Sequence, residues 1–332
     1  MSATTATSGR LSRAWMARLQ RYSLVVMLLL VVILFAGISK PFFTISNLDN
    51  VLLQAAATAI AAVGMTFVII LAEIDISIGS LMSLAITVAW MAGVAHGAVA
   101  GVAATVDAWI YPVGLAMGVL LGLVNGLLIN LLGINALIAT LATMFAFRGI
   151  ALKLVGAGDM TFLQSAVMFL GRTELFGVGL PVYVMLVVAA VAALVLRRTP
   201  VGRYLYAIGG SQRSARETGL PVKRMRLVAY GVSGFCAALA GLIITSQVGT
   251  LQASLGEGFE FTVITAVVVG GTSLLGGRGT IIGSILGAIL LVVIDNGLNL
   301  INASVYIYDV VKGVILILAV MIDVLLLRRL RE

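Results

Sequence analysis

Long apolar segments, separated by short polar or glycine-rich connections, follow one another along almost the whole chain. A helix needs about 20 predominantly apolar residues to cross the hydrocarbon core of a bilayer, and about ten of the segments approach that length. We expect membrane-spanning helices at about 22–39, 51–71, 78–96, 110–130, 135–154, 180–197, 226–246, 259–276, 280–300 and 306–327. The pattern therefore predicts an all-α polytopic membrane protein with about ten transmembrane helices, in which 1–332 form a single transmembrane domain.

Two parts of the chain share an order of polar and apolar positions that predicts an internal repeat. Residues 66–88 and 265–294 each contain an apolar run, a polar or glycine-rich break, and Ile-Gly-Ser at the start of another apolar run. If helices 2–5 and 7–10 are duplicates, the odd number of crossings between them gives the two copies opposite orientations. Transporters often contain such inverted repeats with broken helices, so we expect an inverted repeat of helices 2–5 and 7–10.

The composition supports solvation by lipid and assigns an orientation. Of 332 residues, 61% are hydrophobic and 10% are charged, whereas soluble domains contain about 25% charged residues. The net charge is +8, and Lys and Arg gather in the tail 1–21, in 197–226 and in the tail 328–332. Basic residues favour the cytoplasmic side, so both termini and 197–226 are predicted to be cytoplasmic. The same distribution argues against nucleic acid as a partner.

The segment 197–226 interrupts the apolar pattern with eight Lys/Arg residues and one carboxylate, Glu217. Within this segment, Ser211 follows two glycines and can cap a short helix that runs through about Thr218, with Gly219 as its stop. A short capped helix at the cytoplasmic face predicts a docking surface for a soluble partner.

A second polar interruption, 72–80, separates the second and third predicted spans and carries Glu73, Asp75 and Ser77. A carboxylate beside hydrocarbon costs about 2.5–3.5 kcal/mol on insertion scales unless it reaches water or a partner. One interpretation is that this break lines a water-filled path or its cytoplasmic gate. The alternative is that Asp75 or Ser77 merely caps the third helix, and both interpretations can hold together.

Polar side chains also occur in the middle of predicted spans. Asp295, Asn296 and Asn299 share one broad face of the ninth span, and Asn125 in the fourth span is similar. Such groups face protein or a cavity, so they either line a substrate path or join helices by hydrogen bonds. A polar lining with few charges suits a hydroxyl-rich solute better than an ion. The predicted path or gate consists of Asp75, Ser77, Asn125, Asn296 and Asn299.

Charged residues near the ends of two spans have structural interpretations. Asp309 and Lys312 stand three residues apart at the start of the last span, which predicts an ion pair on one helix face. Arg148 and Lys153, near the outer end of the fifth span, are expected to extend their charges to the membrane interface, and a docking role for an extracytoplasmic protein is the alternative.

Several kinds of chemistry are excluded by what the sequence lacks. Cys236 and His96 are the only residues of their types, which excludes an internal disulfide, a cysteine metal site and a multi-histidine site. No G-x-x-x-x-G-K-[ST] phosphate loop occurs, so the chain is not an ATPase of that type. We expect no metal, no cofactor and no enzymatic activity, since no set of nucleophile, base and orienting group is present.

Together, these motifs identify a resemblance that covers nearly the whole chain. The chain resembles the permease subunits of bacterial ATP-binding-cassette sugar importers, in the ribose-type branch that also serves xylose, arabinose, galactose, rhamnose and autoinducer-2. The matching stretches are IDISIGS (74–80), NG (125–126), IATLATM (138–144), RG (148–149), YAIGGSQRSARETGLPV (206–222), GGTSLLGGRGTIIGS (270–284), NGLNL (296–300) and VVKG (310–313).

The resemblance implies a bacterial inner-membrane location and three kinds of partner besides membrane lipid. These are an ATPase subunit, a periplasmic sugar-binding protein, and a second permease subunit with which this chain forms the pore. It also implies that 206–222 is the cytoplasmic coupling segment that docks on the ATPase. The residues that carry this role are Gly209, Gly210, Ser211, Ala215, Arg216 and Gly219.

The chain departs from the family pattern at three places. Ser211 stands where the family usually has Asn, Glu73 where it has Gly, and Asn135-Ala136 where it has Pro-Phe. Because the last two changes lie near the suspected path, the identity of the sugar is not carried over. An ATP-independent transporter of a small polar solute is the alternative, but a self-contained carrier has no need for a docking helix.

Overall fold

The computed structural model describes residues 24–94, 108–156, 160–161, 167–252 and 254–331, so the tail 1–21 lies outside the described residues. The first described helix is Leu24–Ile38. The elements after it are η1 Lys40–Phe43, α2 Ile45–Ile70, α3 Ile78–Val94, α4 Ile110–Leu132, α5 Ala136–Val155, β1 Met160–Thr161, α6 Val167–Arg172, β2 Glu174–Leu175, β3 Val178–Gly179, α7 Leu180–Arg198, α8 Pro200–Gly210, α9 Gln212–Glu217, α10 Val222–Val248, β4 Thr250–Leu251, α11 Phe259–Val269, α12 Ile281–Leu300 and α13 Val305–Arg331.

The predicted helical membrane architecture is confirmed. Six helices in the described part of the chain, α2, α4, α5, α7, α10 and α12, are long and apolar enough to cross a membrane. The first helix, α3 and α11 are shorter apolar helices, and α13 is the last long helix, so about ten crossings are compatible with the structure. Two antiparallel strand pairs, β1–β4 and β2–β3, are the only sheets among these residues.

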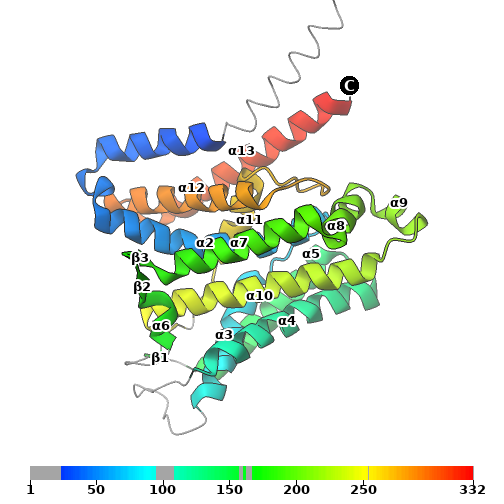
Figure 1. Ribbon diagram of the computed structural model, residues 1–332, viewed down its shortest axis with the longest axis horizontal. Helices are drawn as coiled ribbons and strands as arrows, with labels where there is room; N and C mark the ends of the chain where they lie inside the picture. Colours follow the sequence, from blue (N-terminus) through cyan, green and yellow to red (C-terminus); the bar gives the residue numbers. More distant parts are fainter. Residues whose placement is uncertain (1–23, 95–107, 157–159, 162–166, 253, 332) are drawn as a thin grey trace, which may run out of the picture.

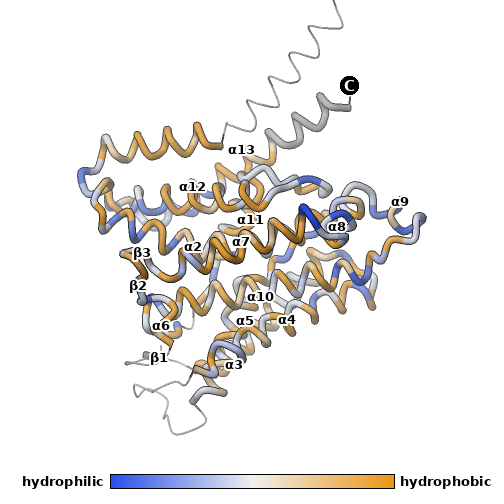
Figure 2. The backbone as a smooth tube through the Cα atoms, in the orientation of Figure 1, coloured by the Kyte–Doolittle hydropathy of each residue, from blue (hydrophilic) through white to orange (hydrophobic). Residues whose placement is uncertain are grey.

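Helices α2 and α10 form the centre of the bundle (Figure 1). Their most apolar stretches are 89% and 72% buried, against 22% for α7, which lies at the periphery. The two helices are antiparallel, because Arg226 at the start of α10 contacts Glu73 just after α2, and Gln247 near the end of α10 donates to the carbonyl of Leu53 near the start of α2. Apolar residues cover most helices, and hydrophilic residues gather at the end that carries α8 and the start of α10 (Figure 2).

The helix contacts obey the symmetry expected of the predicted repeat. Helices α2–α5 correspond to α10–α13, since the pair α2–α12 mirrors α10–α4, α3–α4 mirrors α11–α12, and α3–α5 mirrors α11–α13. Because α2 and α10 run in opposite directions, the repeat is inverted. The Ile-Gly-Ser segments, however, are not equivalent in it. The break after α2 corresponds to the connection 249–258 after α10, whereas Ile282-Gly283-Ser284 lies in α12.

Glycine spacing explains how α4 packs so closely on α10. Gly114, Gly118, Gly122 and Gly126 recur every four residues on one face of α4. A Cβ on Gly122 would overlap the carbonyl of Tyr230, so no side chain separates the two helices there. Small residues at this spacing allow close backbone approach, which is a main source of helix association in lipid.

The two half-helices α3 and α11 begin beside each other inside the bundle. With 17 and 11 residues they are about 26 and 17 Å long, shorter than the hydrocarbon core of about 30 Å. Gly79 in the first turn of α3 lies against the backbone of Gly256, and the carboxylate of Glu260 lies 2.6 Å from the Cβ position of Gly79. The predicted span 259–276 therefore ends as a helix at Val269, where the glycine-rich segment from Gly270 begins.

Gly122→Ala should destabilise the protein, because the added methyl group must push α4 away from α10. Overpacking of this kind costs about 1–3 kcal/mol, which should lower the melting temperature of the purified protein in detergent. Gly149→Ala is the matched control, since it also lies within a helix but has nothing within 4 Å of its Cβ position. Equal melting temperatures for the two variants would contradict this account of the α4–α10 contact.

Candidate functional site

The basic segment 197–226 folds into two helices, α8 and α9, at one end of the bundle (Figure 1). The predicted cap is confirmed, because the Ser211 hydroxyl accepts a hydrogen bond from the backbone N–H of Ser214 at 3.3 Å. The predicted stop is also confirmed, since α9 ends at Glu217 and Gly219 adopts a left-handed conformation with φ +78°. Helix α8 was not anticipated, although Pro200 at its first position is a known start signal.

Helix α9 has a buried side and an exposed side. Ala215 is only 4% exposed, and its carbonyl accepts a hydrogen bond from Leu220, so this residue seats α9 on the body of the protein. Arg213, Arg216 and Glu217 are exposed, and Arg213 pairs with Glu217 at 3.0 Å. The surface available to a partner is therefore the charged side of α9, and a change at Ala215 would disturb the helix itself.

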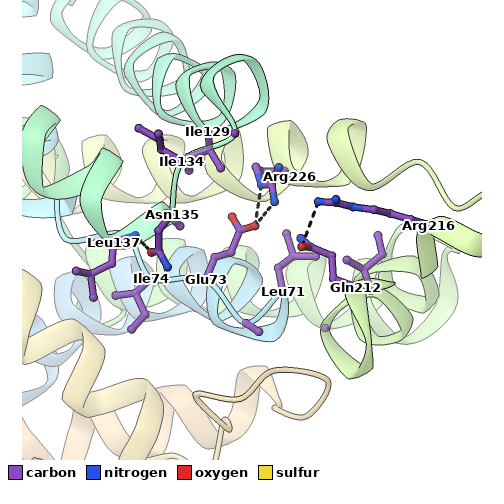
Figure 3. Close-up of a pocket in the computed structure, with 15 residues that line it drawn as sticks. Leu71, Glu73, Ile74, Ile129, Ile134, Asn135, Leu137, Gln212, Arg216 and Arg226 are labelled. Atoms are coloured by element: carbon purple, nitrogen blue, oxygen red, sulfur yellow. Dashed lines mark hydrogen bonds and ion pairs between the residues drawn. The ribbon is translucent and has the colours of Figure 1, made fainter. Parts of the chain in front are cut away.

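A pocket of about 610 Å³ lies between α9, the break after α2 and the turn between α4 and α5. Figure 3 shows Glu73 and Arg226 facing each other within it, while Arg216 extends from α9 towards Gln212. The Arg216 guanidinium donates to the Gln212 side chain at 3.2 Å. The lining residues are Leu71, Ala72, Glu73, Ile74, Ile129, Gly133, Ile134, Asn135, Ala136, Leu137, Ile208, Gly209, Gln212, Arg216 and Arg226.

The carboxylate of Glu73 is neutralised by an ion pair that the sequence did not reveal. Its Oε1 lies 2.5 Å from Nη2 of Arg226 and accepts a hydrogen bond from Nε at 2.7 Å. Nη1 of Arg226 donates to the Asn130 side chain at 2.6 Å, and both ionised side chains are 8% exposed. Arg226 stood among the basic loop residues in the sequence, where only its charge was apparent. Its buried position at the start of α10 makes it a partner for Glu73, the carboxylate that stands where the related family usually has Gly.

Three residues of the predicted path form one buried network. Asp75 accepts hydrogen bonds from the backbone N–H of Ser77 at 3.0 Å, from the Ser77 hydroxyl at 2.7 Å and from the Ser233 hydroxyl at 3.2 Å. Asn125 donates to the Ser77 hydroxyl at 2.7 Å. The network ties the break to α4 and α10, and the bond to the N–H of Ser77 agrees with the helix-start interpretation. Asp75, Ser77 and Asn125 are fully buried, so their role in a path stays a prediction.

The other two predicted path residues lie elsewhere. Asn296 on α12 exchanges a reciprocal pair of amide hydrogen bonds, of 3.0 and 2.8 Å, with Asn47 at the start of α2. Asn299 is exposed. The start of α2 is opposite the end where Glu73 and Arg226 meet, so the structure does not bring the two asparagines together with Asp75. The hydrogen bonds of Asn296 join α12 to α2, as the structural interpretation of these residues expects. A role of Asn296 in transport stays a prediction.

One prediction about charged residues is wrong, and another stays untested. Lys312 pairs with Asp295 on α12 at 3.0 Å, and not with Asp309 on its own helix, because α12 places this partly buried carboxylate within reach of the Lys312 ammonium group. The expectation that Arg148 extends to the membrane interface stays a prediction. The Arg148 Nη1 donates to the carbonyl of Leu255 at 2.8 Å, which links α5 to the segment before α11.

An inverted repeat with broken helices, together with a capped helix held at one end, defines a polytopic membrane permease. Residues 47–320 match the family described as branched-chain amino acid transport system / permease component, and the chain belongs to this family. It is a multi-pass inner-membrane transport component and not an enzyme.

Curated relatives cover almost the full length of the chain. The ribose import permease protein of Escherichia coli (strain K12) is 38% identical over 327 residues, which cover 96% of this chain and 98% of that protein. The D-allose transport system permease protein of the same organism is 33% identical, with coverage of 91% of each chain. Its xylose transport system permease protein is 32% identical, with coverage of 96% and 95%. No solved structure matches the chain.

Arg226→Met should destabilise the protein strongly, because it leaves the buried Glu73 carboxylate without its counter-ion. Removing one partner of a buried ion pair typically costs about 3–5 kcal/mol, which should appear as a large fall in melting temperature in detergent. The double variant Arg226→Met with Glu73→Leu should recover much of the loss. Arg224→Met removes an exposed charge two residues away and serves as the control. A melting temperature for Arg226→Met equal to that of Arg224→Met would show that the pair is not needed.

Proposed function

We propose that this chain is the membrane-spanning subunit of an ATP-binding-cassette importer that moves a monosaccharide or related polyhydroxy solute into the cytoplasm. The observation that carries the proposal is α9, a short capped helix seated by Ala215 with its charged side exposed. The full-length relatives are named as permeases for ribose, allose and xylose, which supports a sugar as the cargo. A separate ATPase subunit would supply the energy, since the chain has no phosphate loop of its own.

The proposed assembly contains two permease subunits, the ATPase subunit or subunits, and a periplasmic sugar-binding protein. Both termini and α8–α9 face the cytoplasm in this proposal, because Lys and Arg concentrate there. The exposed charges Arg213, Arg216 and Glu217 then form the surface that meets the ATPase. Coupling residues Gly209, Gly210, Ser211 and Gly219 shape the backbone on either side of α9: Ser211 caps its start, and Gly219 follows its end in a left-handed conformation.

Asp75, Ser77 and Asn125 would reach the path only when the break after α2 separates from α4 and α10. Their complete burial within this chain supports a closed state in which the hydroxyl and amide groups satisfy one another. In an open state, a sugar with many hydroxyl groups would replace these bonds. Contacts of this kind must be weak for cargo to leave, so we expect no tight sugar site in the permease. Asn296 and Asn299 would contribute at the opposite end.

Reversing the exposed charges of α9 should abolish coupling without harming the fold. In the double variant Arg213→Glu with Arg216→Glu, we expect at least about a tenfold loss of co-purified ATPase and of ATP-driven uptake of D-ribose, D-allose or D-xylose in vesicles supplied with the binding protein. Lys40→Glu, an exposed charge reversal before α2, is the control. If the double variant still binds the ATPase as well as the unaltered protein does, the docking role of α9 is wrong. Sugar uptake in the absence of the ATPase would favour an ATP-independent transporter.

Cysteine labelling tests the proposed orientation of the chain in the membrane. In a Cys236→Ala background, Arg213→Cys should react with a membrane-impermeant maleimide only from the cytoplasmic side, whereas Glu174→Cys in the β2–β3 hairpin should react only from outside. Both positions are exposed, and the hairpin lies at the opposite end of α7 from α8 and α9 (Figure 1). Ready labelling of position 213 from the periplasm would overturn the proposed topology.

A further inference from the structure

Three backbone segments meet at Gly209 with no side chain between them. A Cβ on Gly209, near the end of α8, would overlap the carbonyl oxygen of Ile70, the last residue of α2, and would lie 2.6 Å from the backbone nitrogen of Gly277. The same nitrogen donates a hydrogen bond to the Ile70 carbonyl at 2.9 Å. The end of α8 is therefore packed against the end of α2 and the connection between α11 and α12 at a single point.

The connection between α11 and α12 is a stiff partner in this contact. Ser273 and Arg278 are joined by a backbone hydrogen bond of 3.2 Å, and Gly276 donates to the carbonyl of Ser273 at 2.9 Å. Gly276 and Gly277 have φ of +81° and +70°, a left-handed backbone that favours glycine. The loop is thus held in one shape by internal bonds and by residues that tolerate that backbone.

A side-chain hydrogen bond reinforces the contact one helical turn earlier. The Tyr206 hydroxyl on α8 donates to the carbonyl of Gly279 at 2.8 Å. Burial raises the pKa of Tyr206 above its ordinary value, an effect that the nearby positive charge of Arg197 partly opposes. The hydroxyl therefore stays protonated and available as a donor at physiological pH.

Helix α9 follows this contact without a flexible linker. Ser211, its cap, comes two residues after Gly209, and the buried Ala215 fixes α9 on the body of the protein. On the far side of the contact, α2 ends at Ile70 and passes directly into the break with Glu73 and Asp75. A displacement of α9 must therefore act on that break and on the connection to α12 together.

We infer that Gly209 is a positioning residue for coupled transport, which transmits movement of α9 through backbone contact to the end of α2 and to the α11–α12 connection. The inference rests on the docking role proposed for α9. Closely packed protein is hard to compress, so segments that touch backbone to backbone move as one unit or repack into a second arrangement. A side chain at this position would hold α8 away from both segments and weaken that link.

Gly209→Ala tests the inference, with Gly313→Ala as the matched control. Both replace a glycine within a helix, but the Cβ position of Gly313 has nothing within 4 Å. Complexes with the ATPase subunit are reconstituted with the binding protein and supplied with D-ribose, D-allose or D-xylose. For Gly209→Ala, the amount of sugar moved per ATP hydrolysed should fall at least about tenfold while the ATPase still co-purifies. The control should stay within about twofold of the unaltered protein.

Tyr206→Phe is a second variant that tests the inference if Gly209→Ala does not insert into the membrane. It removes only the hydrogen bond to Gly279, and the ratio of sugar moved to ATP hydrolysed should fall about fivefold with normal insertion and ATPase binding. Unchanged ratios in the variants that insert would overturn the inference. Loss of the ATPase from Gly209→Ala would also overturn it, because the defect would then lie in docking. Failure of the docking role itself would appear separately, in the charge reversals of α9.

Discussion

The carboxylate of Asp75 fixes the centre of this protein, because a charged or polar group inside an apolar bundle must find all its partners in the protein. Two serines supply those partners, one beside it in the break and one on α10, and Asn125 on α4 extends the network. The break after α2 is thereby held against two long helices. The start of α3 follows directly from this anchored break, because Ser77 stands immediately before Ile78.

Glycine allows the rest of the bundle to close around this anchor. The row of glycines on α4 lets it approach α10, and Gly79 and Gly256 let the two half-helices start side by side. Without side chains at these points, the inverted repeats can share one core in which α2 and α10 are almost wholly enclosed. Lipid tails are as apolar as the helix side chains, so the hydrophobic effect does little to hold the helices together. Close packing of their backbones stabilises the bundle instead.

Basic residues at the end of the bundle that carries α8 and α9 serve two different physical purposes. Arg213 and Arg216 are exposed on α9, where they are available to a partner. Arg226 is buried and compensates Glu73, so it belongs to the core, although Lys223 and Arg224 just before it are exposed. Between these sites, Gly209 and Tyr206 join α8 to the end of α2 and to the connection between α11 and α12. This end of the bundle is thus one packed unit with a charged surface.

The sequence by itself determined the helical membrane class, the approximate spans, the cap at Ser211 and the stop at Gly219, since each depends on residues close together along the chain. It also indicated the correct repeating helices, although the shared Ile-Gly-Ser segments were not equivalent. Only the tertiary structure decided that Lys312 pairs with Asp295, that Arg226 pairs with Glu73 and that Asn296 pairs with Asn47. Each of these partners comes from another helix, and which helix faces which is set by packing, a property of the whole bundle that no local pattern contains.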